Sequence, residues 1–556
     1  MTRSLYDTPP AAWRVLATLA AATGVALAHA QPVDPPAGFA LIGHIEKFTL
    51  DAPGVRTSSA KVTVRGIEVV LPANLIITMP GGSLSAEQLF RGRDFKTPET
   101  PRRTGLALAE MNDADLTCPL ALAAPCKKCA LPAAEIELVG NIIGGRYIAG
   151  TARISQGGLH IGGGFIRSID TSSGFFTVGA DAGTGTTARL RFNDPQGIYG
   201  PRPDPARPLL IDQRFALDPG NAPVHARTGF PVCLTDSARP GLCPTSNRAS
   251  DARAANYRRF TCGTTPAGNT EPVLPGCQPH LPIPLREGDY VNYVGMLDKD
   301  DTGYFISLHG LDAEIGAYTS PGVDPAYVFV EEAIQGTKGA RYLLDAAIPA
   351  LGTIPQEETA RYKLVGFTTD PSRTVTVEIF DDDGHSNPQA PTFAPTRLAT
   401  RIVPTNLAQL GRFKMIWAAK EEARIVRRNV RVMLSAATAP PFDAALAPGQ
   451  ASNDLPAGSI PAGASKRGGY AFGQYEAPVS EYISPEITRF GSKGWPVPVN
   501  FEDFCFLKAS NDIDTQEPAG ATGYVRITTT VLVPSPINPT RTRSQARADG
   551  STVCGD

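Results

Sequence analysis

The feature of this sequence that most limits its fold is an alternation of polar and apolar residues along short segments. The alternation is most regular over Lys61–Leu71, and a period of two is typical of a strand with one buried face. Helical periodicity is scarce and is confined to Ser85–Phe90, Arg341–Ala350 and Ala418–Arg428. We therefore expect a mostly β protein in which Lys61–Leu71 is one strand. Further strands are expected at Asn74–Met79, Glu135–Val139, Gly174–Val178, Arg189–Phe192, Tyr290–Leu297, Tyr304–Leu308, Ala326–Glu331, Thr374–Phe380, Val430–Leu434 and Tyr524–Val533.

Glycine and proline separate these segments. The chain holds 54 glycines and 51 prolines, a content that favours many short strands joined by turns. A strand–turn–strand unit occurs at Gly164–Val178 and again at Gly295–Leu308. Repeated hairpins are typical of small antiparallel barrels or sandwiches. We therefore expect several small antiparallel β-barrel or sandwich units, OB-like in type, with disulfide-stapled connectors.

Composition divides the 556 residues into segments. Residues 202–280 are dense in proline, glycine, arginine and cysteine, whereas 436–469 have the alanine, proline, glycine and serine content of a linker. The expected order is a signal peptide (1–30), a first β unit with a cysteine loop (31–132), a second β unit (133–201), a connector (202–280), a third β unit (281–349), a fourth β unit (350–435), a linker (436–469) and a C-terminal segment (470–556).

The first thirty residues have the layout of a secretory signal peptide. Arg3 and Arg14 precede a short apolar run, Val15–Ala28, and Ala28-His29-Ala30 supplies small residues at a cleavage position. We expect the mature chain to begin at Gln31 and to be extracytoplasmic, whether periplasmic, at the cell surface or secreted. No later segment has the ~18 continuous apolar residues of a membrane-spanning helix, so the mature chain is expected to lack a transmembrane segment.

Nine cysteines fall in local groups. In an exported protein such cysteines are expected to form disulfides, because no reducing buffer opposes oxidation there. Cys126 and Cys129 form a Cys-x-x-Cys motif between prolines, which favours a structural disulfide and leaves a redox pair or a metal site as alternatives. Cys118 is then left free or intermolecular. The other expected pairs are Cys233–Cys243, Cys262–Cys277 and Cys505–Cys554.

Several chemistries lack their sequence signatures. The formal net charge of −2 argues against nucleic acid as a partner, which would require a basic face. No histidine of the mature chain lies within four residues of another, and neither a nucleophile elbow nor a phosphate loop is present. The glycine runs Gly157–Gly158 and Gly162–Gly164 are expected between strands, where they open no helix.

For two acidic turns, calcium binding is a minor alternative interpretation. Asp298, Asp300 and Thr302 place oxygens at positions one, three and five of a calcium loop, but the twelfth position is His309. Asp381 and Asp383 belong to a second acidic run. If Gly384 is placed at the sixth position of the loop, Ile379 falls at the first position, where the loop requires an oxygen ligand. Both segments are first interpreted as solvated hairpin turns, where aspartate and glycine are favoured. Calcium is the one candidate cofactor, and none is otherwise expected.

Four segments are similar to a family of exported proteins from bacteria and filamentous fungi. They are Gly316–Val328 (GAYTSPGVDPAYV), Thr228–Cys233 (TGFPVC), Gly366–Arg373 (GFTTDPSR) and Pro498–Leu507. The family is uncharacterised, so the resemblance implies secretion and β-architecture and assigns no catalytic residues.

Together these features favour an exported binding or structural protein over an enzyme. The expected partner is an unknown protein or a polysaccharide. The alternative is a secreted hydrolase that acts on a polymer through paired carboxylates. Six aromatic residues are expected in the core or in turns, with a sugar- or protein-binding surface as the alternative: Tyr304, Tyr318, Tyr327, Tyr470, Tyr475 and Trp495.

Overall fold

A computed structural model describes most of the chain between residues 37 and 483. The expected signal peptide, the linker at 436–469 and the chain beyond 483 lie outside the described residues, as do the two expected helices at Arg341–Ala350 and Ala418–Arg428. Among the residues described, no helix has the length and apolar character needed to cross a membrane. Apart from short internal gaps, the described ranges are 37–90, 134–192, 223–336, 362–381, 396–417, 429–435, 472–478 and 481–483.

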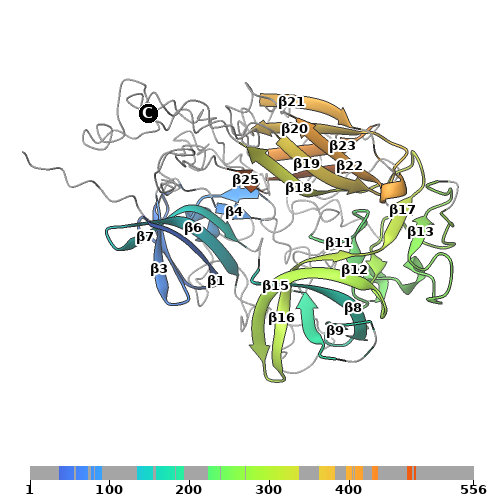
Figure 1. The fold of residues 1–556 in the computed structure, drawn as a ribbon, viewed down its shortest axis with the longest axis horizontal. Coiled ribbons are helices and arrows are strands. Elements are labelled where there is room, and N and C mark those ends of the chain that lie inside the picture. The colour runs from blue at the N-terminus through green and yellow to red at the C-terminus, as the bar shows by residue number, and fades with distance from the viewer. Residues whose placement is uncertain are drawn as a thin grey trace, which may run out of the picture. The chain divides into compact units, whose positions relative to one another are not determined.

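The first barrel consists of five strands that close on themselves (Figure 1). Their order is β3-β2-β1-β6-β7, and the barrel closes where β3 and β7 pair in parallel. A short hairpin extends the sheet beyond β7, and a 3-10 turn follows the hairpin. The 3-10 turn falls where the sequence predicts a helix at Ser85–Phe90. The elements are β1 (Ala37–Leu50), β2 (Ala60–Val64), β3 (Ile67–Leu71), β4 (Ile77–Met79), β5 (Gly82–Leu84), η1 (Glu87–Phe90), β6 (Glu135–Ile143) and β7 (Arg146–Ile154).

The segment Lys61–Leu71, expected as one strand, is a hairpin. Arg65 and Gly66 have φ angles of 52° and 74°, which suit a two-residue turn that matches the twist of the flanking strands. Val64 pairs with Ile67 across this turn. The buried positions therefore change from even numbers before the turn to odd numbers after it, so the alternation shifts by one position at Arg65–Gly66. Buried side chains from both strands enter the barrel core: Val62, Val64, Val69 and Leu71.

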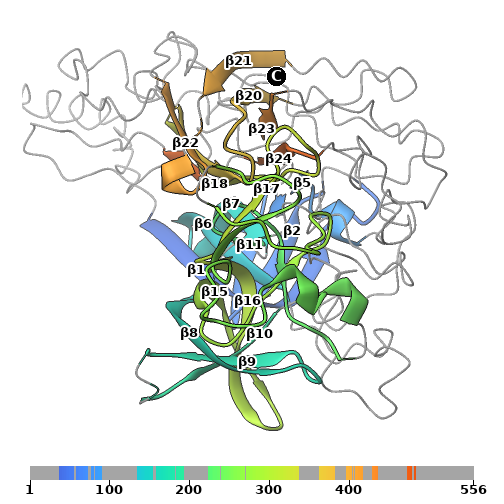
Figure 2. The ribbon, with the colours of Figure 1, turned by 90° about the vertical axis from the view of Figure 1, so that its right-hand side faces the viewer.

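The second barrel has the same arrangement. Its order is β10-β9-β8-β15-β16, closed by a parallel pairing between β10 and β16 (Figure 2). The two hairpins expected to repeat in separate units, β8–β9 and β15–β16, belong to this one barrel, where β8 pairs with β15. The strands of residues 133–201 are thus divided between two sheets, because β6 and β7 complete the first barrel. The elements are β8 (His160–Asp170), β9 (Phe175–Gly179), β10 (Ala188–Phe192), β15 (Tyr290–Asp300), β16 (Gly303–Ala313) and β11 (Val224–Ala226), the last paired with β16.

Between β10 and β15 the chain forms a disulfide-linked segment. Disulfides join Cys233 to Cys243 and Cys262 to Cys277, as the spacing predicts. Several apolar residues of this segment pack into the core of the second barrel, so the connector is part of that folded unit. Its short elements are β12 (Val232–Cys233), η4 (Pro240–Leu242), η5 (Thr245–Asn247), β13 (Arg259–Cys262) and β14 (Ile283–Pro284); β17 (Gly316–Thr319) pairs with β13.

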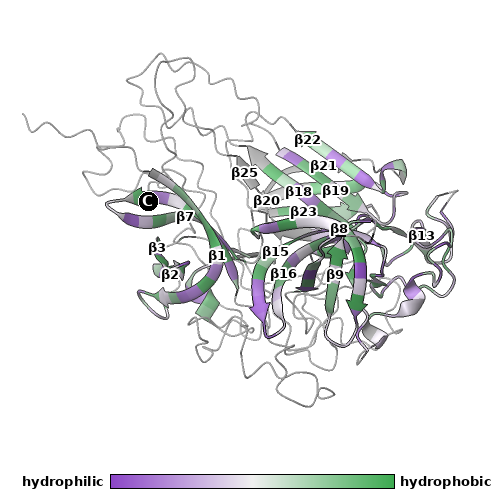
Figure 3. Ribbon diagram, turned by 60° about the horizontal axis from the view of Figure 1, so that its bottom comes forward, coloured by the Kyte–Doolittle hydropathy of each residue, from purple (hydrophilic) through white to green (hydrophobic). Residues whose placement is uncertain are grey.

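The last unit has two four-stranded sheets. One has the order β22-β19-β18-β25 and the other β21-β20-β23-β24. Both contribute to one hydrophobic core, as in an immunoglobulin-like sandwich, and hydrophobic and hydrophilic residues alternate along the strands (Figure 3). These findings confirm the mostly β prediction of barrel and sandwich units. The elements are β18 (Val328–Gly336), β19 (Tyr362–Thr368), β20 (Val375–Asp381), β21 (Thr396–Val403), η7 (Leu407–Gln409), β22 (Arg412–Trp417), β23 (Asn429–Leu434), β24 (Gln474–Pro478) and β25 (Glu481–Ile483).

Candidate functional site

The second barrel carries an open cleft of about 540 Å³. Strands β8, β9 and β15 form it together with the loop between β9 and β10. Apolar pockets that contain a few polar groups are the usual places for ligand binding. The lining residues are Gly163, Gly164, Phe165, Val178, Gly179, Ala180, Asp181, Thr186, Thr187, Ala188, Tyr290 and Tyr293.

Glycine backbone faces two tyrosine side chains in this region. The run Gly162–Gly164 lies inside β8, not between strands as the sequence suggested, and Gly162 pairs directly with Tyr293 on β15. A Cβ atom on Gly162 would lie 2.6 Å from Cζ of Tyr293, and one on Gly163 would lie 2.9 Å from the Tyr290 hydroxyl oxygen. Any larger residue would therefore displace the tyrosines. The glycines allow the two side chains to lie against the strand.

Phe165 and Tyr290 form an aromatic wall of the cleft. They pair across β8 and β15, and their ring centroids are 5.2 Å apart in an edge-to-face arrangement that is favourable for aromatic pairs. The guanidinium of Arg167 lies 5.9 Å from the centre of the Phe165 ring. These contacts fix the orientation of the wall.

The charge of the cleft is low. Among the described lining residues, Asp181 is the one carboxylate and there is no lysine or arginine. Thr186 and Thr187 add hydroxyl groups. Burial raises the pKa of Tyr293, so its hydroxyl remains protonated at neutral pH and can donate a hydrogen bond. The cleft thus combines aromatic rings with uncharged hydroxyls and a single acid.

A buried ion pair holds the strand that carries Tyr290. Arg248 and Asp289 are fully buried, and the guanidinium meets the carboxylate with two bonds of 2.9 and 3.1 Å. Arg248 also donates to the carbonyl oxygens of Tyr257 and Pro284. The backbone of Asp289 accepts a hydrogen bond of 2.8 Å from the amide of Ile166 on β8. The network therefore fixes the start of β15 against β8, immediately before Tyr290.

The first calcium candidate lies in the β15–β16 hairpin. Both carboxylate oxygens of Asp300 accept bonds from Arg189, at 2.9 and 2.8 Å, and Thr302 donates to the same carboxylate through its amide and its hydroxyl. The bonds to Arg189 hold the pKa of Asp300 well below its usual range. Asp298 accepts a bond from the amide of Lys299. These interactions are those of a hairpin turn closed by a guanidinium.

The second calcium candidate falls largely outside the described residues. Asp381 ends β20, and its side chain is outside them, as is Asp383. Within the described part of the chain, no group of three or more histidine, cysteine, aspartate or glutamate residues could hold a metal ion. Asp298, Asp300 and Thr302 are not among the described residues that line the cleft.

The remaining sequence candidates are distributed as follows. Cys118, Cys126, Cys129, Cys505 and Cys554 lie outside the described residues, so their pairing stays a prediction. Tyr304 is 65% exposed, whereas Tyr318 (0%) and Tyr327 (3%) are core residues. Tyr475 packs against the sandwich core, and Tyr470 and Trp495 are outside the described part of the chain.

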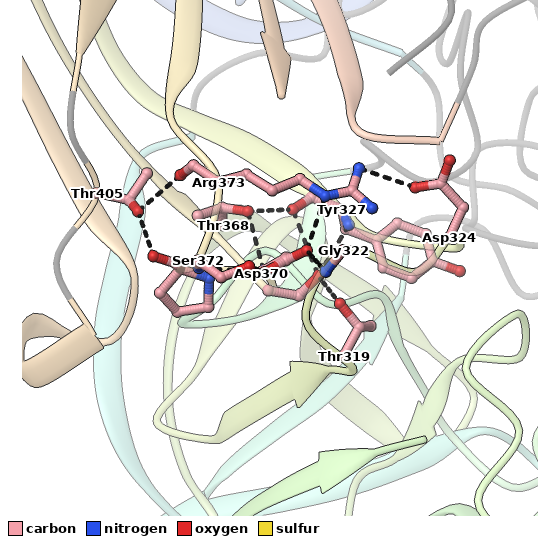
Figure 4. A network of polar contacts seen from close by, with 11 residues as sticks. Thr319, Gly322, Asp324, Tyr327, Thr368, Asp370, Ser372, Arg373 and Thr405 are labelled. Atoms are coloured by element: carbon pink, nitrogen blue, oxygen red, sulfur yellow. Dashed lines mark hydrogen bonds and ion pairs between the residues drawn. The ribbon is translucent and has the colours of Figure 1, made fainter. Parts of the chain in front are cut away.

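The segments Gly316–Val328 and Gly366–Arg373 meet in a buried polar network (Figure 4). At its centre, Asp370 is 0% exposed and accepts hydrogen bonds from the amide of Gly322, at 2.8 Å, and from the hydroxyl of Ser372, at 2.5 Å. Arg373 forms ion pairs with Asp370 and Asp324, at 2.8 and 3.1 Å. Two acids share one arginine, and Asp370 and Arg373 are buried. The arrangement is suited to holding backbone segments in place.

The segment Thr228–Cys233 joins the same region. The hydroxyl of Thr228 donates to the carbonyl oxygen of Ala317, and the ring of Phe230 lies 5.0 Å from that of Tyr327. Gly229, at φ 88°, has backbone so near Phe329 that a Cβ atom would lie 2.9 Å from Cβ of Phe329. Thr228–Cys233 and Gly366–Arg373 therefore both contact Gly316–Val328.

Comparison with family models, with curated proteins and with solved structures finds no match to this chain.

Proposed function

We propose that this chain is an extracytoplasmic binding protein that holds a neutral polysaccharide in the cleft of its second barrel. The observation that carries the proposal is the composition of the cleft: the rings of Phe165 and Tyr290 stand on one face of the sheet beside Gly163, and Tyr293, which also lines the cleft, packs against the barrel core. The apolar faces of sugar rings pack on aromatic side chains, and sugar hydroxyls bond to threonine, tyrosine and carboxylate groups. OB-like barrels are known to bind oligosaccharides as well as oligonucleotides.

The low charge of the cleft favours oligosaccharides over oligonucleotides as ligands. Nucleic acids and acidic glycans need several lysine or arginine side chains to neutralise them. The described lining residues include neither, and Arg167, beside the Phe165 ring, is a single neighbouring cation. A neutral glycan has no such requirement. The two disulfides of the connector support an oxidising, extracytoplasmic location.

The alternative function, a hydrolase with paired carboxylates, lacks support at this cleft. Glycosidic hydrolysis needs two carboxyl groups about 5–10 Å apart on either side of the bond, and Asp181 is the one acid in the lining. A single carboxylate can orient a hydroxyl without cleaving the glycan.

Affinity electrophoresis tests the proposal. The purified chain is run through native gels that contain laminarin, glucomannan or hydroxyethylcellulose, with polygalacturonate and heparin as charged probes. We expect at least one neutral glycan to retard the protein and Tyr290→Ala to reduce the retardation at least tenfold. Tyr290→Phe should preserve ring stacking and lose less. Tyr304→Ala, at an exposed tyrosine outside the cleft lining, serves as the matched control and should migrate like the parent protein.

Two results would overturn the proposal. One is retardation by the charged glycans alone. The other is a protein that no neutral glycan retards, with the fold of each variant verified by circular dichroism. Release of reducing ends from a neutral glycan would instead support the hydrolase.

A further inference from the structure

An exposed apolar stripe runs along β8 beside the cleft. Ile161 is 81% exposed and Leu159 is 47% exposed, although both are large hydrophobic residues. Ile161 pairs with Val294 on β15, and Gly163 pairs with Asn292. We define the β8 stripe as Leu159, Ile161, Val294, Gly163 and Asn292.

The β8 stripe and the aromatic wall lie on the same face of the sheet. Alternate residues of a strand point to the same side, so Ile161, Gly163 and Phe165 share one face. Directly paired residues of antiparallel strands also share a face, which adds Val294, Asn292 and Tyr290. Six residues separate Leu159 from Phe165, a span of about 20 Å at ~3.3 Å per residue. The stripe therefore extends the cleft by more than the length of one sugar ring.

We propose that the cleft and the β8 stripe together bind one linear neutral glycan, with successive sugar rings placed along β8 from Tyr290 to Ile161. This inference rests on the proposed function and specifies its ligand as a chain of several rings. An exposed apolar surface that continues a binding cleft marks a contact surface. The stripe contains no charged residue, which fits an uncharged ligand.

The shape of the stripe supports an extended ligand. The space over Gly163 is filled by the Asn292 Oδ1 atom and the Tyr290 hydroxyl, which lie 2.8 and 2.9 Å from where a Cβ atom would be, so the stripe presents polar atoms between Ile161 and Phe165. Asn292, opposite Gly163, offers an amide to sugar hydroxyls. Ile161 lies two positions from Gly163 on the same face of β8. Its side chain provides a second apolar contact for the face of a sugar ring.

The test measures affinity against ligand length. Laminari- and cello-oligosaccharides, from the disaccharide to the heptasaccharide, are titrated into the full-length chain by calorimetry. We expect the affinity of the parent protein to rise with length and then to reach a plateau. Ile161→Ser should leave disaccharide affinity unchanged and lower heptasaccharide affinity at least fivefold. Val55→Ser, at an exposed valine of the first barrel, is the matched control and should change neither.

The outcomes distinguish this inference from the proposed function. If short and long oligosaccharides bind equally well, or if Ile161→Ser weakens both alike, the extended site is refuted and the cleft remains. If no oligosaccharide of any length binds, the proposed function itself fails. Sedimentation of the parent protein and of Ile161→Ser tests a second copy as occupant. A dimer that Ile161→Ser dissociates would also overturn the inference.

Discussion

Replacing Asp289 by asparagine should destabilise the second barrel and leave the first barrel unchanged. The carboxylate of Asp289 is fully buried and neutralises the buried guanidinium of Arg248. Asparagine keeps the size of the side chain and removes its charge. The arginine would then remain buried without a counter-ion, because its other described partners are backbone carbonyl groups and the ring of Tyr257.

The expected loss follows from this geometry. Two charge-assisted hydrogen bonds, of 2.9 and 3.1 Å, join the pair. Removing one partner of such a buried pair costs about 3–5 kcal/mol, mainly because the other charge is left uncompensated. At ~1.4 kcal/mol per factor of ten, local opening of the barrel should become at least a hundredfold more frequent.

Hydrogen–deuterium exchange followed by mass spectrometry measures this change strand by strand. Peptides from β8 and β15 should lose protection in Asp289→Asn, since the Ile166 amide bonds directly to the Asp289 backbone. Peptides from β1, β2 and β3 provide the internal control. The double variant Arg248→Met with Asp289→Leu removes both charges and should regain much of the stability, as apolar replacements of buried ion pairs often do.

Two results would refute this reasoning. A loss below about 1 kcal/mol in Asp289→Asn would mean that the ion pair is solvated, as a surface pair is. A double variant no more stable than Asp289→Asn would mean that the destabilisation comes from packing and not from the uncompensated charge.

Three further predictions concern other parts of the chain. Burial raises the pKa of Tyr318 to about 12. The contribution of Tyr318 to stability is therefore complete below pH ~10 and is lost as the pH rises towards 12. Urea titrations should show a smaller dependence of stability on pH in Tyr318→Phe than in the parent protein. Because the Tyr318 hydroxyl has no hydrogen-bond partner among the described residues, the same variant should gain about 1 kcal/mol at pH 7. Replacing Cys262 and Cys277 together by serine opens a loop of sequence separation 15 and should lower the urea midpoint by the equivalent of about 3 kcal/mol; an unchanged midpoint would contradict a stabilising role. Hydrogen bonds from Ser172 and Ser173 lower the pKa of Asp170 to about 2. The β8–β9 turn should therefore be stable above pH ~4 and should loosen as the pH falls towards 2. In the double variant Ser172→Ala with Ser173→Ala, NMR should show the midpoint of this transition at a higher pH.

Local pattern predicts the strands of this chain well and their partners poorly. Alternation locates β6, β9, β10, β15, β16 and β23 to within a few residues. The turn at Arg65–Gly66 is missed when Lys61–Leu71 is interpreted as a single alternating run, because the shift of the buried positions by one residue is then overlooked. The signal that was present is the change from Val62 and Val64 to Val69 and Leu71.

Long-range pairing is the part that the sequence does not determine locally. Each barrel closes by a parallel pairing between strands separated by an inserted segment, β3 with β7 and β10 with β16. Such register depends on contacts between distant residues. The cleft cannot be predicted from the sequence for the same reason. Gly162 and Tyr293 are 131 positions apart, and only the pairing of β8 with β15 brings the glycine opposite the ring. A glycine run in an otherwise apolar, alternating segment, together with a Tyr-x-x-Tyr spacing in another strand, is the available hint, because aromatic side chains can cover glycine in a neighbouring strand.

The three sequence segments that meet near Asp370 and the residues that line the cleft lie in different parts of the structure. Hydrogen bonds join Thr228–Cys233 to Gly316–Val328 and Gly316–Val328 to Gly366–Arg373, and Asp370 is buried among them. No residue of the cleft lining belongs to these segments. A chain that shares the three segments would therefore be expected to share the arrangement around Asp370, but the segments place no constraint on Tyr290 or the glycines of β8. Ligand preference among similar chains should follow the residues at the positions of Gly162–Phe165 and Tyr290–Tyr293.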